Sequence, residues 1–114
     1  MKKEDIKTIA IIIARGGSKR IHKKNIKLFL GKPIICYSIK TAKNCNLFDE
    51  IMVSTDDKEI AMVAEKEGVK VPFMRSQKNS SDFSTTEEVI KEVLIDYEKI
   101  GINPEYVCCI YPTA

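Results

Sequence analysis

The sequence predicts an α/β fold built on a mostly parallel sheet, because strand-like and helix-like segments alternate along its 114 residues. The first observation is the apolar run Ile9–Ala14, which is too short for a typical helix and rich in β-branched residues. Such a run is typical of a strand buried on both faces. The second observation is that helical patterns with their own capping residues separate the later strand-like segments. Right-handed connections between parallel strands are expected from that alternation.

The first strand is expected over Thr8–Ala14 and is followed by a cationic loop. Ile26–Leu30 is a short apolar segment that ends at Gly31-Lys32-Pro33. Pro33 suits the first turn of a helix, which should continue to about Lys43. The buried face of this helix should hold Ile35, Ile39 and Ala42.

A second strand and a second helix are expected next. Ile51–Ser54 has the pattern of a strand, and Thr55-Asp56-Asp57 offers side chains that can cap a following helix. That helix should span about Lys58–Glu67, with Gly68 as its stop signal. Its inward face should hold Ile60, Val63 and Ala64.

The remaining elements are a third strand at Val71–Met74, a polar loop over Arg75–Ser84, a third helix and a fourth strand. Two overlapping capping boxes in Ser84–Glu88 predict the start of the helix, which should span about Thr86–Lys99. The buried stripe of that helix should hold Ile90, Val93, Leu94 and Tyr97. The fourth strand is expected over Tyr106–Tyr111.

The length and net charge of the chain limit the classes of function that it can have. A chain of 114 residues suits one domain with a real core. Its net charge of +3 and pI of about 8.6 are only mildly basic, whereas a general nucleic-acid binder is expected to exceed a pI of ~9. The cations are concentrated, since residues 15–32 hold seven Lys or Arg and no acid. This distribution favours a small anionic ligand over a long polyanion.

The four cysteines form no CxxC motif, and His22 has no partner at metal-ligand spacing. We therefore expect reduced, structural thiols in a cytoplasmic protein. We expect no signal peptide, and no apolar run in the sequence approaches the ~20 residues that span a bilayer.

The loop after the first strand is the main candidate site. It begins Arg15-Gly16-Gly17-Ser18, where glycines let several backbone N–H groups point at one anion. Five cations lie within ten residues: Arg15, Lys19, Arg20, Lys23 and Lys24. The loop matches neither GxxxxGK[ST] nor GxGxxG, but it has the chemistry of a polyphosphate site. Ligands of parallel sheets bind at the carboxyl ends of strands, so the loops at 15–25, 55–58, 75–84 and from 112 onward should converge there.

Six motifs, in order along nearly the whole chain, resemble those of the cytidylyltransferases that activate nonulosonic acids. They are Ile12–Arg20, Lys24-Asn25, Gly31-Lys32-Pro33, Val53–Asp56, Arg75 and Tyr111-Pro112-Thr113. These enzymes make CMP-sialic acid, CMP-pseudaminic acid and related sugars from CTP. The resemblance implies a three-layer, Rossmann-like nucleotide-diphospho-sugar transferase fold. Family members are longer, so residues 1–114 are expected to be the amino-terminal, nucleotide-binding half, truncated after the fourth main strand. We expect this half alone to be inactive.

The resemblance also implies residue roles. The triphosphate of CTP would be held by Arg15, the backbone of Gly16, Gly17 and Ser18, Lys19 and Lys24. Arg15 and Lys24 would be catalytic, because fixed cations stabilise the charge that develops on the α-phosphate and on pyrophosphate. Asn25, Arg75, Ser84 and Thr86 match family positions near the cytosine and ribose.

Tyr111 stands where the sialic acid branch usually carries Gln, pointing toward the nucleotide or sugar. Pseudaminic acid enzymes often have Tyr there, which favours pseudaminic acid as the substrate. Mg²⁺ is the implied cofactor, with its carboxylate ligands expected in the missing carboxy-terminal half. The implied partners are CTP and a nine-carbon acidic sugar, with no nucleic acid, no membrane and a homodimeric full-length enzyme.

Several alternatives stay open. Arg20, His22 and Lys23 are expected to be surface residues, and the basic stretch 19–24 lacks the aromatics of a nucleic-acid site. Asp56 and Asp57 are either helix caps or a metal pair. Arg75 could be structural, and Ser84 and Thr86 could be caps. The rival functions are a non-catalytic nucleotide-binding module or fragment, and a nucleotidyltransferase for another sugar.

Overall fold

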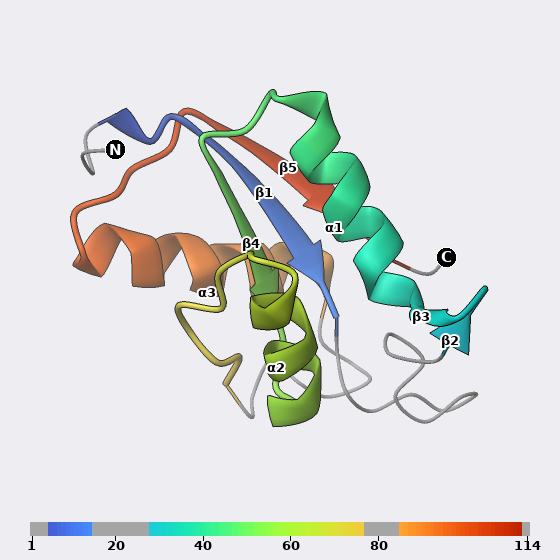
Figure 1. Ribbon diagram of the computed structural model, residues 1–114. Coiled ribbons are helices and arrows are strands. Elements are labelled where there is room, and N and C mark those ends of the chain that lie inside the picture. Colours follow the sequence, from blue (N-terminus) through green and yellow to red (C-terminus); the bar gives the residue numbers. More distant parts are fainter. Residues whose placement is uncertain (1–4, 15–27, 77–84, 113–114) are drawn as a thin grey trace.

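A three-stranded parallel sheet forms the centre of the computed structural model, which describes residues 5–14, 28–76 and 85–112 (Figure 1). Its strands are β1 (Thr8–Ile13), β4 (Glu50–Ser54) and β5 (Tyr106–Ile110), in the order β4-β1-β5. The register places Ile12 beside Val53 on one side and Ile110 on the other. Because all three strands are parallel, their carboxyl ends lie at one edge of the sheet.

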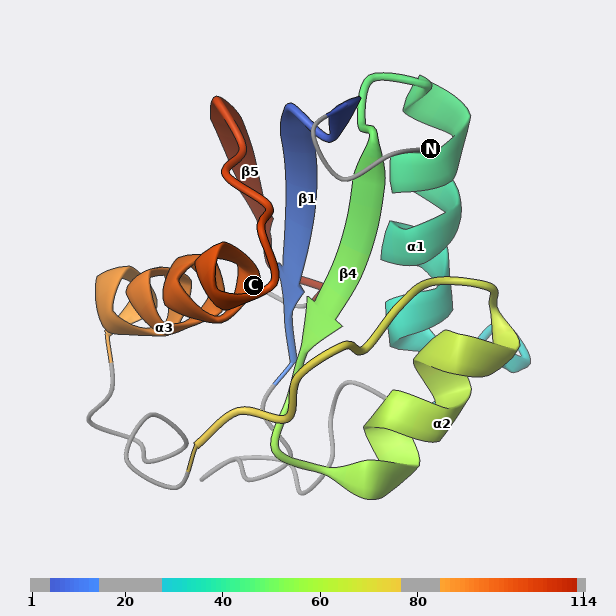
Figure 2. The same cartoon turned by 90° about the vertical axis from the view of Figure 1, so that its left-hand side faces the viewer.

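Helices cover both faces of the sheet and give three layers (Figure 2). Helices α1 (Ile34–Cys45) and α2 (Lys58–Lys66) lie on one face, and α3 (Thr86–Lys99) lies on the other. This arrangement explains the apolar run in the first strand. Residues 9–12 of β1 are completely buried, because alternate side chains point into two different helical layers.

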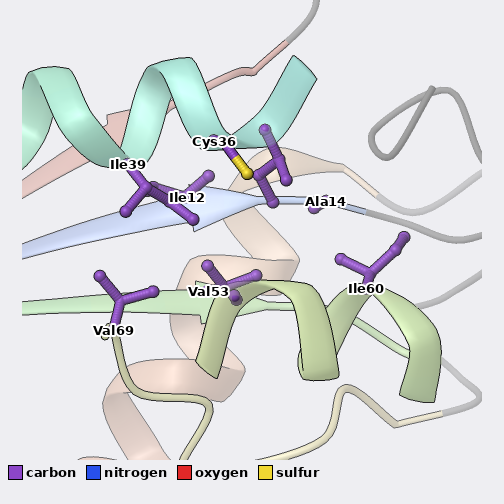
Figure 3. Close-up of a cluster of buried hydrophobic side chains, with 9 residues drawn as sticks. Ile12, Ala14, Cys36, Ile39, Val53, Ile60 and Val69 are labelled. Carbon is purple, nitrogen blue, oxygen red and sulfur yellow. The ribbon is translucent and has the colours of Figure 1, made fainter. Parts of the chain in front are cut away.

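Each layer has its own hydrophobic core. The core under α1 and α2 contains Ile12, Ala14, Ile35, Cys36, Ile39, Val53, Ile60, Ala64 and Val69 (Figure 3). The core under α3 contains Ile6, Ile9, Ile11, Met52, Val93, Tyr97 and Ile102. The expected inward faces of α1 and α2 are confirmed, with Val63 only partly buried. On α3, Val93 and Tyr97 are buried as expected, but Ile90 and Leu94 are only partly buried. Val89, which was not expected on this face, is buried instead. In the second core the rings of Phe73 and Tyr97 meet edge to face, with centroids 5.0 Å apart.

The capping signals in the sequence are confirmed at α2 and α3, since Asp57 and Thr85 are their N-caps. Helix α2 ends at Lys66, and Gly68 has the left-handed φ of 86° that such an end favours. All four cysteines are free thiols, as expected. Among the described residues, no helix has the length and apolar character needed to cross a membrane.

The segment before α1 differs from the prediction. Strands β2 (Leu28–Phe29) and β3 (Lys32–Pro33) have two residues each and form an antiparallel hairpin. Leu30 and Gly31 both have positive φ, 52° and 85°, as a tight primed turn requires. Pro33 is therefore the N-cap residue of α1, with extended backbone, rather than part of the first helical turn.

The prediction of a strand at Val71–Met74 is wrong, because the structure describes these residues and has no strand there. Lys70 forms an isolated parallel bridge to Met52, in which the N–H of Val53 donates to the carbonyl oxygen of Lys70 at 2.9 Å. The chain then follows the outer edge of β4 without forming a ladder. Pro72 explains this, because it has no N–H to donate and so interrupts strand pairing. Val71 and Phe73 still pack against opposite cores, as alternating side chains would.

Strand β5 is the exposed edge of the sheet. Its first three residues are exposed and its last two are half-buried. In contrast to β1, helical cover is incomplete here: Tyr106 and Val107 are 69% and 36% exposed.

Candidate nucleotide site

The carboxyl ends of β1 and β4 are joined at the edge where a ligand is expected. The N–H of Ala14 donates to the carbonyl oxygen of Ser54 at 2.9 Å. Ala14 is the last described residue before the predicted cationic loop, so β4 fixes the backbone immediately before residue 15. Ser54 and Thr55 are nearly inaccessible to solvent, which gives this edge a rigid base.

The residues predicted to bind the triphosphate all lie outside the described residues. These are Arg15, Gly16, Gly17, Ser18, Lys19 and Lys24. Asn25 and Ser84, predicted near the cytosine and ribose, also lie outside them, as do Arg20, His22 and Lys23. Their roles stay predictions from the sequence. The described part of the site consists of Arg75, Thr86, Tyr111 and the residues that hold them.

Arg75 is buried at the end of β4, with 8% of its surface exposed. Its guanidinium donates from Nη2 to the carbonyl oxygen of Ser54 at 2.7 Å and from Nε to the Ser54 hydroxyl at 3.2 Å. Its own N–H donates to the carbonyl oxygen of Thr55 at 2.8 Å. A buried guanidinium needs such partners because its desolvation is costly. Arg75 thus has the structural role that the sequence left open, and its contact with a base or ribose stays a prediction.

Thr86 and Tyr111, which the sequence places 25 residues apart, meet at the same edge. Their hydroxyl groups are hydrogen-bonded to each other. Thr86 is the first residue of α3, and Tyr111 directly follows β5. Two residues predicted to contact CTP or the sugar therefore share one location, and the aromatic ring of Tyr111 is half-exposed beside it.

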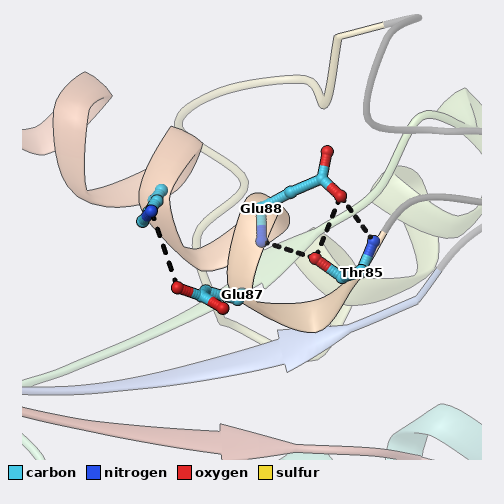
Figure 4. Close-up of polar contacts among 4 residues, drawn as sticks. Thr85, Glu87 and Glu88 are labelled. Atoms are coloured by element: carbon cyan, nitrogen blue, oxygen red, sulfur yellow. Dashed lines mark hydrogen bonds and ion pairs between the residues drawn. The ribbon is translucent and has the colours of Figure 1, made fainter.

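The start of α3 is fixed by a reciprocal capping box (Figure 4). The Thr85 hydroxyl accepts the N–H of Glu88 at 3.1 Å, and the Glu88 carboxylate accepts the N–H of Thr85 at 3.3 Å. In the same turn, Glu87 forms an exposed ion pair with Lys91, one turn further along the helix, at 3.5 Å. Capping by Thr85 leaves the Thr86 hydroxyl available for Tyr111, so the alternative that Thr86 is the cap is wrong.

Asp57 is a helix cap. Its Oδ1 accepts the N–H groups of Glu59 and Ile60 at 2.8 and 3.2 Å, and its own N–H donates to the Thr55 hydroxyl at 3.1 Å. The neighbouring Asp56 is exposed. In the part of the chain that the structure describes, no group of three or more His, Cys, Asp or Glu could hold a metal ion.

The thiols of Cys36 and Cys109 do not fit the role of nucleophile. Burial raises the pKa of the Cys109 thiol, near the end of β5, and the neighbouring Cys108 adds to this effect. Burial, and then Glu67, raise the pKa of Cys36. A thiol with a raised pKa is protonated and poorly nucleophilic at neutral pH. This agrees with the structural role expected from the sequence.

The sequence did not predict the roles of two residues that hold the site. Ser54 accepts hydrogen bonds from Arg75 and Ala14, and although it lies in the motif Val53–Asp56, no such role was expected for it. Glu92 lies in the middle of α3, and its carboxylate accepts the N–H of Ser76 at 3.2 and 3.4 Å. Nothing in the helical pattern distinguishes Glu92 from the other acids of α3.

Comparison with known proteins identifies the family. The family model described as Cytidylyltransferase matches residues 9–113. The chain belongs to the cytidylyltransferase family. It is 46% identical over 109 residues to a pseudaminic acid cytidylyltransferase of Campylobacter jejuni, a match that covers 96% of this chain and 47% of that protein. This chain therefore spans about half the length of that relative.

Two further relatives have lower sequence identity to this chain. A CMP-N,N'-diacetyllegionaminic acid synthase of Legionella pneumophila is 36% identical over 109 residues, covering 96% of this chain and 47% of that protein. An N-acylneuraminate cytidylyltransferase A of Danio rerio is 40% identical over 105 residues, covering 92% of this chain and 23% of that protein.

A solved structure confirms the fold. It is a CMP:2-keto-3-deoxy-manno-octonic acid synthetase complexed with CTP, with a TM-score of 0.77 and 23% identity, and the match covers 93% of this chain and 40% of that one. The expected three-layer, Rossmann-like architecture is therefore correct.

Proposed function

We propose that this chain is the CTP-binding part of a nucleotidyltransferase that couples CTP to a nonulosonic acid of the pseudaminic or sialic type. The products are a CMP-sugar and pyrophosphate. The observation that carries the proposal is the 46% identity to a pseudaminic acid cytidylyltransferase over 96% of the chain. The geometry supports it, because Arg75, Thr86 and Tyr111 lie at one edge of the sheet. The carboxyl ends of the strands and the amino end of α3 form this edge.

In the proposed reaction, a hydroxyl oxygen of the sugar forms a bond to the α-phosphorus of CTP. The bond from that phosphorus to the oxygen of pyrophosphate breaks, and the hydroxyl proton is lost to solvent. Negative charge grows on the α-phosphate and on the leaving group, and we assign its stabilisation to Arg15 and Lys24. The substrate supplies the nucleophile, so no activated side chain is needed.

The base and ribose half of the site is assigned to Asn25, Arg75, Ser84, Thr86 and Tyr111. Arg75 is rigid because β4 holds it, and Thr86 is rigid because it begins a capped helix. Rigid donors and acceptors favour selective binding, since less conformational entropy is lost when the ligand arrives. Tyr111 favours pseudaminic acid among the candidate sugars.

Mg²⁺, a cytoplasmic location and a homodimeric full-length enzyme complete the proposal. No nucleic acid or membrane partner is part of it. Mg²⁺ in nucleotide sites is bound through one or two carboxylates plus substrate phosphates. No step of the reaction is assigned to this ion.

The proposal is tested with neighbouring cations as matched controls. Arg15→Ala and Lys24→Ala should each weaken CTP binding about tenfold or more, measured by titration calorimetry, because each removes a phosphate ligand. Arg20→Ala and Lys23→Ala remove the same charges nearby and should change the affinity less than threefold or so. Equal losses in all four variants would show a diffuse electrostatic attraction and would overturn the assigned roles.

A second function, nucleotide binding without catalysis, stays open because the chain spans 47% of its pseudaminic acid relative. Release of pyrophosphate distinguishes the two. The chain is incubated with CTP, Mg²⁺ and pseudaminic or sialic acid, with a full-length relative as the positive control. We expect binding without turnover from this chain alone. Turnover within about tenfold of the relative would place the complete catalytic site in these residues.

A further inference from the structure

Glu92 connects the middle of α3 to the segment that carries Arg75. Its two carboxylate oxygens lie 3.2 and 3.4 Å from the backbone nitrogen of Ser76, which donates to them. A groove of about 420 Å³ lies between this segment and α3, and Ser76, Glu88, Lys91 and Glu92 are among its lining residues. The Glu92 carboxylate therefore bridges a space that apolar packing does not fill.

Arg75 is held on two sides. From β4, the carbonyl oxygen of Thr55 accepts its N–H at 2.8 Å, and Ser54 accepts its guanidinium at 2.7 and 3.2 Å. From α3, Glu92 holds the next residue along the chain. The backbone on both sides of the Arg75 side chain is thus tied to a rigid element.

The same helix carries Thr86 at its first position. Thr86 and Glu92 are fixed relative to each other by the α-helix, so the bond from Glu92 to Ser76 also sets the position of Arg75 relative to Thr86. Both residues are assigned to the base and ribose half of the proposed site, whereas the triphosphate is assigned to residues 15–24.

We infer that Glu92, together with Ser54, is a positioning residue that holds Arg75 in place for the nucleoside part of CTP. This inference rests on the proposed function. It assigns Glu92 no contact with the ligand. Loss of Glu92 should loosen Arg75 and weaken recognition of the nucleoside, while binding of a bare triphosphate should be unaffected.

The test compares two ligands, CTP and inorganic tripolyphosphate, by titration calorimetry on the same chain. Glu92→Ala should weaken CTP binding about tenfold, the equivalent of about 1.4 kcal/mol, because an arginine that samples many positions binds less tightly. Its affinity for tripolyphosphate should stay within about twofold. Glu92→Gln should bind CTP nearly as the wild type does, because its amide oxygen can still accept the N–H of Ser76.

Glu87→Ala is the matched control, since Glu87 is an exposed acid on the same helix that pairs with Lys91. It should leave both affinities unchanged. Ser54→Ala acts on the other side of Arg75 and should reproduce the selective loss for CTP. The double variant Ser54→Ala/Glu92→Ala should lose less than the sum of the single losses, because both changes act through one arginine.

Two outcomes would overturn the inference. One is wild-type CTP affinity in Glu92→Ala, and the other is an equal loss for CTP and tripolyphosphate, which would indicate a general structural defect. If circular dichroism shows that Glu92→Ala does not fold, the affinities of Glu92→Gln and Ser54→Ala for CTP and tripolyphosphate test the inference instead. A wild-type chain that binds tripolyphosphate and CTP equally well would instead overturn the proposed function, and this inference with it.

Discussion

The hydroxyl of Tyr111 is hydrogen-bonded to the hydroxyl of Thr86, so the residue after β5 is tied to the first residue of α3. Strand β5 is the open edge of the sheet, and α3 covers one face of that sheet. The bond therefore joins two different layers at the edge where the nucleotide is proposed to bind. It also orients the half-exposed ring of Tyr111.

Tyr111→Phe should weaken CTP binding about fivefold, because the loss of one hydrogen bond is worth about 1 kcal/mol and frees the ring to move. Thr86→Val should have a similar effect, and the double variant should be no worse than either single variant. Thr86→Ser keeps the hydroxyl and should bind like the wild type. Calorimetric titration with CTP measures all four variants, and strictly additive losses would show that the two hydroxyl groups act separately.

Asp57 should stabilise the fold as a helix cap and not as a metal ligand. Asp57→Ala should lower the free energy of unfolding by about 1 kcal/mol, as the loss of an N-cap does. Asp57→Asn should recover most of that loss, because Asn caps helices about as well as Asp. Urea unfolding without any metal measures both variants. If Asn were as damaging as Ala, the carboxylate charge would matter beyond capping.

Asp49 should make stability depend on pH. Hydrogen bonds from the backbone N–H groups of Lys7 and then Thr8 hold the pKa of Asp49 below its ordinary value of 3.8. A pKa that is lower in the folded state adds stability above the unfolded-state pKa, and this stability is lost as the pH falls through the folded-state pKa.

Asp49→Asn should therefore unfold at a lower temperature than the wild type near neutral pH, and the difference should shrink below about pH 4. Thermal unfolding between pH 3 and 7 measures this, with the exposed Glu98→Gln as a control. A difference that does not change with pH would assign the effect to packing instead of charge.

Gly68 should tolerate a side chain less well than Gly31. Both have a left-handed φ, 86° and 85°, so alanine at either position costs about 1–2 kcal/mol of strain. A Cβ at Gly68 would also lie 2.7 Å from Lys43 Nζ, which donates to the carbonyl oxygen of Glu67. At Gly31 no described atom lies within 4 Å of the added Cβ.

Gly68→Ala should thus destabilise the protein more than Gly31→Ala in urea unfolding. This additional loss of stability should disappear when each of the two variants is combined with Lys43→Ala. An additional loss that persists without Lys43 would mean that the backbone at Gly68, and not the lysine, resists the change.

The sequence predicted those elements whose patterns are strong and local. Helix α3 has the predicted bounds because its capping box and apolar stripe are both complete. The apolar run of β1 predicted burial on both faces because only a central parallel strand requires it. The Val71–Met74 segment has the composition of a strand, but Pro72 removes a donor that a ladder needs. The hairpin β2–β3 was missed because strands of two residues have no periodicity.

The residues of the candidate site also fall into those that the sequence predicted and those that it did not. Tyr111 could be predicted because it belongs to a motif, and Thr86 because it matches a family position, yet their hydrogen bond could not, because it joins residues 25 positions apart. The roles of Ser54 and Glu92 were missed for a related reason. Each acts through one side-chain contact with a distant backbone group, and such a contact leaves no local pattern. The burial of Arg75 likewise depends on where β4 ends.

Selective binding of CTP is the most direct test of the central claim. Titration calorimetry of this chain with CTP, UTP, ATP and GTP compares four ligands that share one triphosphate. We predict that CTP binds at least about tenfold more tightly than any of the other three, because the base and ribose half of the site is fixed by β4 and α3. Equal affinities for all four nucleotides would leave only a phosphate site and would contradict the assignment to CTP.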